Sequence, residues 1–293
     1  MKRIYPPPEV ITEKCIGCGL CVELCPSFVL DMVNEKASVV RGRWCIGCGH
    51  CGAVCPTAAV LHEATAVEKG PWPEPGPATS PDTLLLLLRE RRSVRAYRDE
   101  PVSDEIIERI LDAGRYAPTG RNSQNVHYVV LGSQEEIAQL REMTMRFYEK
   151  VFSRVRGRLG AFLLRLLAGR RVVEYLQESI PKVEHVKELI EQGKDPLFYH
   201  APAVMVVHAE SWDTCSAFNC ALALYNCSLM AHTLGVGCCF NGYLESAINN
   251  DRRIKKRLGI PREHRCFGAM TLGYQEVRYH WLVERDPAKV TWR

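Results

Sequence analysis

Eight cysteines near the start of the chain form two runs with the same spacing. The first run occupies residues 15–26 and the second residues 45–56, and both read C-x2-C-x2-C-x3-C-P. Three thiolates two residues apart on a tight loop can wrap one corner of an iron–sulfur cube, and the glycines between them let backbone amides approach its sulfides. Zinc ribbons use pairs of C-x2-C instead, so the spacing favours clusters over zinc or a disulfide scaffold. The cysteines are Cys15, Cys18, Cys21, Cys25, Cys45, Cys48, Cys51 and Cys55.

This spacing resembles bacterial ferredoxins that hold two [4Fe–4S] clusters, in which the fourth cysteine of each run ligates the other cluster. The resemblance therefore implies two crossed ligand sets. One set is Cys15, Cys18, Cys21 and Cys55, and the other is Cys45, Cys48, Cys51 and Cys25. His50 lies inside the second run, but the four cysteine positions are complete without it, so we expect no ligand role for it.

A second group with binding chemistry is RRSVR at residues 91–95, where three arginines and a serine lie within five positions. The guanidinium group presents a planar fork of donors that suits a phosphate. A solvated helix end would have the same composition. These residues alone leave both interpretations open.

The wider pattern resembles the FMN-dependent nitroreductase family from about residue 84 to residue 293. The order and spacing of several segments carry the match. They are RRSVRAY at 91–97 followed by PVS at 101–103, APTGRNSQ at 117–124, LGVG at 234–237, FNG at 240–242, GIP at 259–261, GY at 273–274 and a late Arg285. The resemblance implies a homodimer with FMN at the subunit interface.

The resemblance also implies which residues contact FMN. The phosphate and ribityl contacts fall to Arg91, Arg92, Ser93, Arg95 and Arg285. A loop that reaches FMN from the partner subunit would supply Pro118, Thr119, Gly120, Asn122 and Gln124. The segment beside the isoalloxazine ring is Phe240, Asn241 and Gly242. No residue is assigned a catalytic role.

One departure from the family pattern follows this loop. The family continues it with proline and a large aromatic residue, whereas Asn125 and Val126 stand here. We expect a pocket edge that is more polar and less filled.

Six further cysteines repeat no cluster spacing. A buried free cysteine behaves as a small hydrophobic residue, so we expect core packing, with a redox thiol near FMN or a third metal site as alternatives. The six are Cys215, Cys220, Cys227, Cys238, Cys239 and Cys266.

Residues 141–173 are rich in lysine and arginine, and their apolar positions follow helical spacing. This pattern predicts a basic amphipathic helix. A lid over the flavin pocket or a cover at the dimer interface is the favoured role, and a membrane-surface element is the alternative.

The elements that must position these groups fall into two parts. We expect a small two-cluster ferredoxin-like domain of βαβ type over residues 1–69, a proline-rich linker over 70–82 and an FMN-binding domain over 83–293. The second domain alternates helices and strands, with strands predicted at 128–131, 203–207, 236–240 and 270–272. Helices should begin after Ser80, Ser103 and Ser133, and a long one should run from about 214 to Gly235. No dinucleotide fingerprint is present, so we assign an α+β fold with a mostly antiparallel sheet flanked by helices.

Composition excludes several classes of function. The net charge of +4 over 293 residues is too small to indicate nucleic-acid binding. No apolar stretch reaches the ~20 residues of a membrane span, and residues 1–8 do not resemble a signal peptide, so we expect a cytoplasmic protein.

Together these features predict an FMN- and iron–sulfur-dependent oxidoreductase. It would reduce a small organic substrate, such as a nitro compound, an enone or a quinone, with electrons delivered through the clusters from an external low-potential donor protein. Direct reduction of FMN by NAD(P)H stays open. The alternatives are a flavin and iron–sulfur electron-transfer subunit, a dehydrogenase that passes electrons outward, and a non-redox module that binds membranes through the basic helix.

Overall fold

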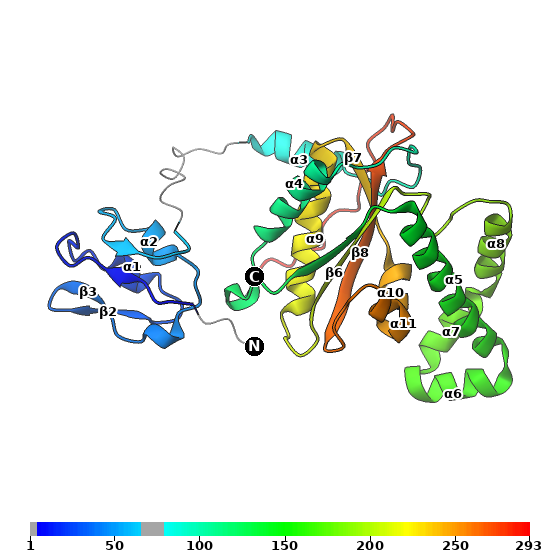
Figure 1. The fold of residues 1–293 in the computed structure, drawn as a ribbon, viewed down its shortest axis with the longest axis horizontal. Coiled ribbons are helices and arrows are strands. Elements are labelled where there is room, and N and C mark those ends of the chain that lie inside the picture. The colour runs from blue at the N-terminus through cyan, green and yellow to red at the C-terminus, as the bar shows by residue number, and fades with distance from the viewer. Residues whose placement is uncertain (1–4, 66–78) are drawn as a thin grey trace. The chain divides into compact units, whose positions relative to one another are not determined.

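The computed structural model describes residues 5–65 and 79–293, and the chain divides into two compact units (Figure 1). The first unit contains the cysteine-rich segment and residues 119–124, and the second contains residues 79–118 and 125–293. Residues 70–78 of the predicted linker lie outside the described residues. Helix α3 (Pro81–Glu90) begins within the predicted linker range, where the Ser80 side chain accepts a hydrogen bond from the Thr83 amide and proline occupies the first turn.

The first unit consists of short elements, and each cysteine run contains one short helix. Its two antiparallel strand pairs are β1 with β4 and β2 with β3. In chain order the elements are β1 (Glu9–Val10), α1 (Leu20–Glu23), β2 (Leu30–Val33), β3 (Lys36–Val39), the 3₁₀ turn η1 (Gly42–Trp44), α2 (His50–Ala53) and β4 (Val60–Leu61). Leu30, Ala37, Ala59 and Val60 form its small core together with buried cysteines. A core of this size buries too little apolar surface to stabilise a domain unaided.

Glycine is required in the first cysteine loop. Gly17 has φ +72°, and a Cβ there would lie 2.3 Å from the Glu35 carbonyl oxygen. Any side chain would therefore push the loop away from the β2–β3 turn. Gly47 has the same left-handed conformation in the second run, with φ +64°.

The second unit is built on a four-stranded antiparallel sheet with the order β5-β6-β8-β7. The strands are β5 (His127–Leu131), β6 (Ala203–Glu210), β7 (Val236–Phe240) and β8 (His264–Tyr274). All four strands were predicted, although β8 is longer than the three residues expected. The α+β fold is confirmed.

Helices cover both faces of this sheet (Figure 1). On one face, α9 (Ser216–Thr233) packs against β6, α4 (Asp104–Arg115) packs on α9, and both helices share one core cluster with Met205 and Val207 of β6. On the other, α5 (Gln134–Arg156), α10 (Gly242–Asn250) and α11 (Arg252–Arg257) pack against Val204 and Val206. Because β6 is covered on both faces, its sequence reads as a nearly continuous apolar run.

The prediction of one continuous basic helix over residues 141–173 is wrong. The segment is divided among α5, α6 (Arg158–Ala168) and α7 (Arg170–Glu178), and α8 (Ile180–Glu191) follows. Gly157 and Gly169 occupy the breaks, and Gly169 has φ +86°. The apolar side chains Leu159, Phe162 and Leu166 of α6 are exposed. Among the described residues, none of the helices is both long and apolar enough to cross a membrane.

Candidate functional site

The eight cysteines of the two runs gather into two groups in the first unit. The residues that line one small cavity include Cys15, Cys18, Cys21 and Cys55. The residues that line the other include Cys25, Cys45, Cys48 and Cys51. Each group therefore takes three cysteines from one run and the fourth from the other, as the crossed pattern predicts. Four thiols around one small cavity are the donor set that a cubane cluster needs.

Backbone amides turn toward the sulfur atoms at the fourth position of each run. The Val29 amide donates to Cys25 Sγ at 3.3 Å, and the Ala59 amide donates to Cys55 Sγ at 3.2 Å. Such bonds favour thiolate over thiol. Burial acts the other way at Cys51, where it raises the pKa of the thiol to about 11. A metal must therefore displace the Cys51 proton at neutral pH.

His62 is a neighbour of the second group that the motif did not predict. It is buried, its Nδ1 accepts a hydrogen bond from the Ala64 amide at 3.0 Å, and its Nε2 lies 3.5 Å from Cys45 Sγ. Because Nδ1 acts as the acceptor, Nε2 carries the proton and donates toward the sulfur. His50 is exposed, although it also lines the second cavity.

In the second unit, the predicted phosphate arginines line two neighbouring pockets. Arg91 and Arg92 line one of about 420 Å³ together with Cys238 and Tyr279. Both arginines also line a second pocket, of about 340 Å³, and Arg285 lies in its wall. The segment is held against β7, because the Val94 amide donates to the Cys238 carbonyl at 2.9 Å.

Arg91 has an unsatisfied hydrogen-bond donor beside these two pockets. Its Nε is buried and has no hydrogen-bond partner in the structure. A buried donor without a partner is rare, and it indicates a ligand acceptor or water. The Arg95 guanidinium carbon lies 6.0 Å from the centre of the Tyr199 ring. The Ser93 carbonyl accepts from the Tyr279 hydroxyl at 3.4 Å.

The residues expected beside the isoalloxazine ring lie where β7 ends and α10 begins. Phe240 is partly exposed, and a Cβ on Gly242 would meet nothing within 4 Å. Asn241 is buried: its side chain accepts from the Leu244 amide at 3.0 Å and donates to the Leu197 carbonyl at 2.8 Å. Asn241 thus caps α10 and leaves its neighbours as the exposed part of the turn.

The predicted loop from Pro118 to Gln124 is divided between the units. Pro118 belongs to the second unit, whereas Thr119, Gly120, Asn122 and Gln124 belong to the first. Within the first unit, the Asn122 side-chain amide donates to the carbonyls of Ile46 and Gly47, both at 3.0 Å. The Gln124 amide donates to Thr119 Oγ1 at 3.0 Å.

Asn125, which departs from the family pattern, belongs to a polar network in the second unit. Its side-chain amide donates to Glu210 Oε2 at 3.2 Å and to Ser216 Oγ at 3.2 Å, and it accepts from Asn219 at 2.9 Å.

Near this network lie His127, His208 and His264, from three adjacent strands. Burial lowers the pKa of His208 to about 4, and burial also lowers the pKa of His264. This histidine cluster had no signal in the sequence, because its members are far apart along the chain.

Five of the six scattered cysteines are buried in the second unit, in agreement with core packing. Burial raises the pKa of Cys220, Cys227 and Cys266 to about 12, so these thiols stay protonated and unreactive. Cys238 and Cys239 are buried in β7, and Cys215 is only partly buried.

Comparison with known proteins agrees with this arrangement. The profile of the nitroreductase family matches residues 88–274, and the profile of a 4Fe-4S dicluster domain matches residues 8–70. A protein of Methanothermobacter thermautotrophicus, provisionally named an NADH dehydrogenase or NAD(P)H nitroreductase, is 25% identical over 65% of this chain and 76% of its own length. Two crystal structures of nitroreductases with bound FMN share the fold. The one from Bacteroides fragilis has a TM-score of 0.53 at 24% identity and covers 73% of this chain and 98% of its own. The one from Desulfitobacterium hafniense has a TM-score of 0.52 at 23% identity and covers 71% and 96%. The chain therefore belongs to the nitroreductase family and carries a 4Fe–4S dicluster domain in front of its nitroreductase domain.

Proposed function

We propose that this chain is an FMN-dependent oxidoreductase that reduces a small organic substrate with electrons delivered through two [4Fe–4S] clusters. The observation that carries the proposal is the presence, in one chain, of two four-cysteine groups and an arginine-lined pocket with an unsatisfied buried donor. The substrate class is that of nitro compounds, enones, quinones and related acceptors.

The cofactors are FMN and two [4Fe–4S] clusters. Bound FMN supplies hydride transfer, and the clusters supply single electrons. The protein groups bind and orient: Arg91, Arg92 and Arg285 line one pocket and can together neutralise a phosphate. Because FMN accepts electrons singly or in pairs, two one-electron clusters match the two electrons of one hydride.

FMN binding requires a second copy of the chain in this proposal. Four of the five leucines of α3, Leu84, Leu85, Leu86 and Leu88, have exposed fractions of 37% to 52%. In the C-terminal segment, Trp281 and Trp292 are 87% and 90% exposed. Apolar surface of this extent is typical of an interface, and a homodimer with FMN between its subunits would cover it.

The electron donor is an external low-potential protein, with NAD(P)H as a second source. The names of relatives support the second source, since one is called an NADPH-dependent oxidoreductase of Staphylococcus haemolyticus. We place the protein in the cytoplasm, where a reducing environment maintains thiols and clusters.

The test is anaerobic purification followed by reoxidation of the photoreduced enzyme. The purified protein should contain about eight iron and eight sulfide per chain, together with about one FMN. Nitroaromatics, enones, halogenated phenols and quinones are then supplied one at a time while the flavin band is followed. Rapid reoxidation by at least one class supports the proposal. Absence of FMN, or a flavin that none of these compounds reoxidises, would contradict it.

A further inference from the structure

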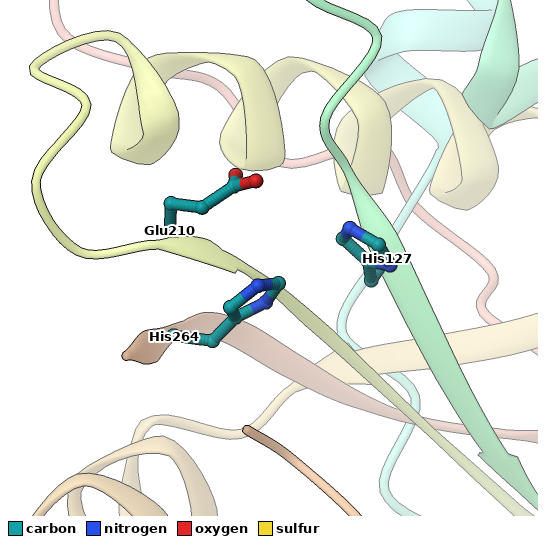
Figure 2. Close-up of side chains that lie close together, drawn as sticks. All are labelled: His127, Glu210 and His264. Carbon is teal, nitrogen blue, oxygen red and sulfur yellow. The ribbon is translucent and has the colours of Figure 1, made fainter. Parts of the chain in front are cut away.

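Three side chains converge at one end of the second unit's sheet (Figure 2). His127 begins β5, Glu210 ends β6 and His264 begins β8, and these three strands are adjacent in the sheet. One ligand atom from each residue lies within 4.8 Å of the other two. The register explains the meeting, because His264 pairs with Glu210 across β6 and β8, and His127 pairs with His208 across β5 and β6.

The chemistry of these groups is that of a transition-metal site. Two imidazole nitrogens and one carboxylate oxygen form the three-ligand set of open zinc sites. In a tetrahedral site with bonds of about 2.1 Å, neighbouring ligand atoms lie about 3.4 Å apart. Side-chain rotations that move each ligand atom by about 1 Å would bring the three atoms to that spacing. His127 is exposed, so the ion has an entry path and a position for water.

The surrounding groups hold two of these ligands in place. His208 Nδ1 lies 2.9 Å from His264 Nδ1, a hydrogen bond that leaves His264 Nε2 for an ion. The Asn125 amide donates to Glu210 Oε2 at 3.2 Å, which fixes the carboxylate. Lys255 donates to the backbone carbonyl of His264. Partners that orient a ligand through its other atom are a regular feature of metal sites.

We propose that His127, Glu210 and His264 bind one Zn²⁺ ion, with water at the fourth position. The ion cross-links the ends of β5, β6 and β8 and clamps the edge strand β5 to the sheet. It is separate from the arginine pocket: Cys238, which lines that pocket, pairs with Leu272, eight residues and about 27 Å along β8 from His264. The proposal does not depend on the proposed function.

The probe is Zn²⁺ itself, added anaerobically to the full-length, untagged protein with its clusters and flavin in place. Zinc, iron and sulfide are measured after dialysis, and the affinity is measured by calorimetry. The expected result is one zinc per chain without loss of iron, together with a rise in the unfolding temperature. Mg²⁺ should give neither effect, because it prefers oxygen ligands.

Two variants and a matched control locate the ion. His127→Ala and Glu210→Gln should each weaken zinc binding by at least about tenfold and abolish the rise in unfolding temperature. His185→Ala is the control, because His185 and Glu188 form an exposed pair at 3.2 Å that offers two donors instead of three. It should bind zinc as the wild type does. The proposal is overturned if the wild type binds no zinc, if zinc uptake matches iron loss, or if both variants bind zinc as tightly as the wild type.

Discussion

Replacement of Arg91 by methionine separates a ligand-binding arginine from a structural one. Methionine keeps most of the length of the side chain and removes the guanidinium group. In the structure, Arg91 Nε is buried without a hydrogen-bond partner, although the residue lines the pocket shared with Arg92 and Arg285. If the phosphate of FMN is the missing acceptor, the charge of Arg91 stabilises the complex and not the free protein.

The size of the effect follows from the lost contact. A hydrogen bond to a charged group contributes about 1.5–3 kcal/mol, and about 1.4 kcal/mol corresponds to a factor of ten. The Kd for FMN should therefore rise roughly 10- to 150-fold. An unsatisfied buried donor costs about 1–3 kcal/mol, so its removal should not lower the unfolding temperature of the FMN-free protein.

The assay is fluorescence titration of FMN-free protein with FMN, with thermal unfolding measured on the same samples. Arg115→Met is the control, because Arg115 is exposed on α4 and pairs with Asp112 at 2.7 Å. It should leave FMN affinity unchanged. An Arg91→Met variant with wild-type FMN affinity, or with an unfolding temperature several degrees lower in the absence of FMN, would refute the reasoning.

Three further predictions concern the cluster domain and the turn after β7. Cys25→Ala should damage the cluster of the second cysteine run, and loss of the first run's signal in electron paramagnetic resonance would show that the crossing is wrong. His62→Leu should lower the reduction potential of the same cluster, because it removes a donor near Cys45 Sγ; an unchanged or raised potential in a redox titration would count against that contact. Asn241→Ala should reduce the free energy of unfolding by about 2–4 kcal/mol, because it removes the cap of α10 and leaves the Leu197 carbonyl unpaired. Denaturant unfolding of FMN-free protein checks this value, and a change below about 0.5 kcal/mol would contradict it.

Local sequence signals predicted much of the fold because the physics behind them is local. Ser80, Ser103 and Ser133 each accept a hydrogen bond from the backbone amide three residues later, as N-cap residues should. The two cysteine groups were likewise predictable, because their spacing resembles a pattern with known crossing. The length of strand β8 was underestimated, because its first half contains polar and small residues such as Arg265 and Gly268.

The remaining features depend on tertiary structure. A cluster that joins His127, Glu210 and His264 arises only when three strands are brought into register. The family pattern predicts Asn241 at the flavin site, and it carries no signal for the second role of this residue, whose side chain caps α10 and donates to the distant Leu197 carbonyl. The basic segment was expected to be one helix because its apolar spacing continues through Gly157, where the backbone turns instead. Periodicity alone does not report such a break.

The most direct test of the central claim counts the electrons that leave the fully reduced enzyme through the flavin. The photoreduced full-length protein is titrated anaerobically with a two-electron substrate that reoxidises it, and the flavin and cluster signals are followed together. Fully reduced FMN carries two electrons and each of the two clusters carries one. The expected result is therefore consumption of about two equivalents of substrate per chain, with recovery of both the flavin and the cluster signals. The Arg91→Met variant, stripped of FMN, should keep its clusters reduced under the same titration. Consumption of about one equivalent while the clusters stay reduced, or cluster reoxidation in the stripped variant at the wild-type rate, would contradict the claim that the clusters feed the flavin.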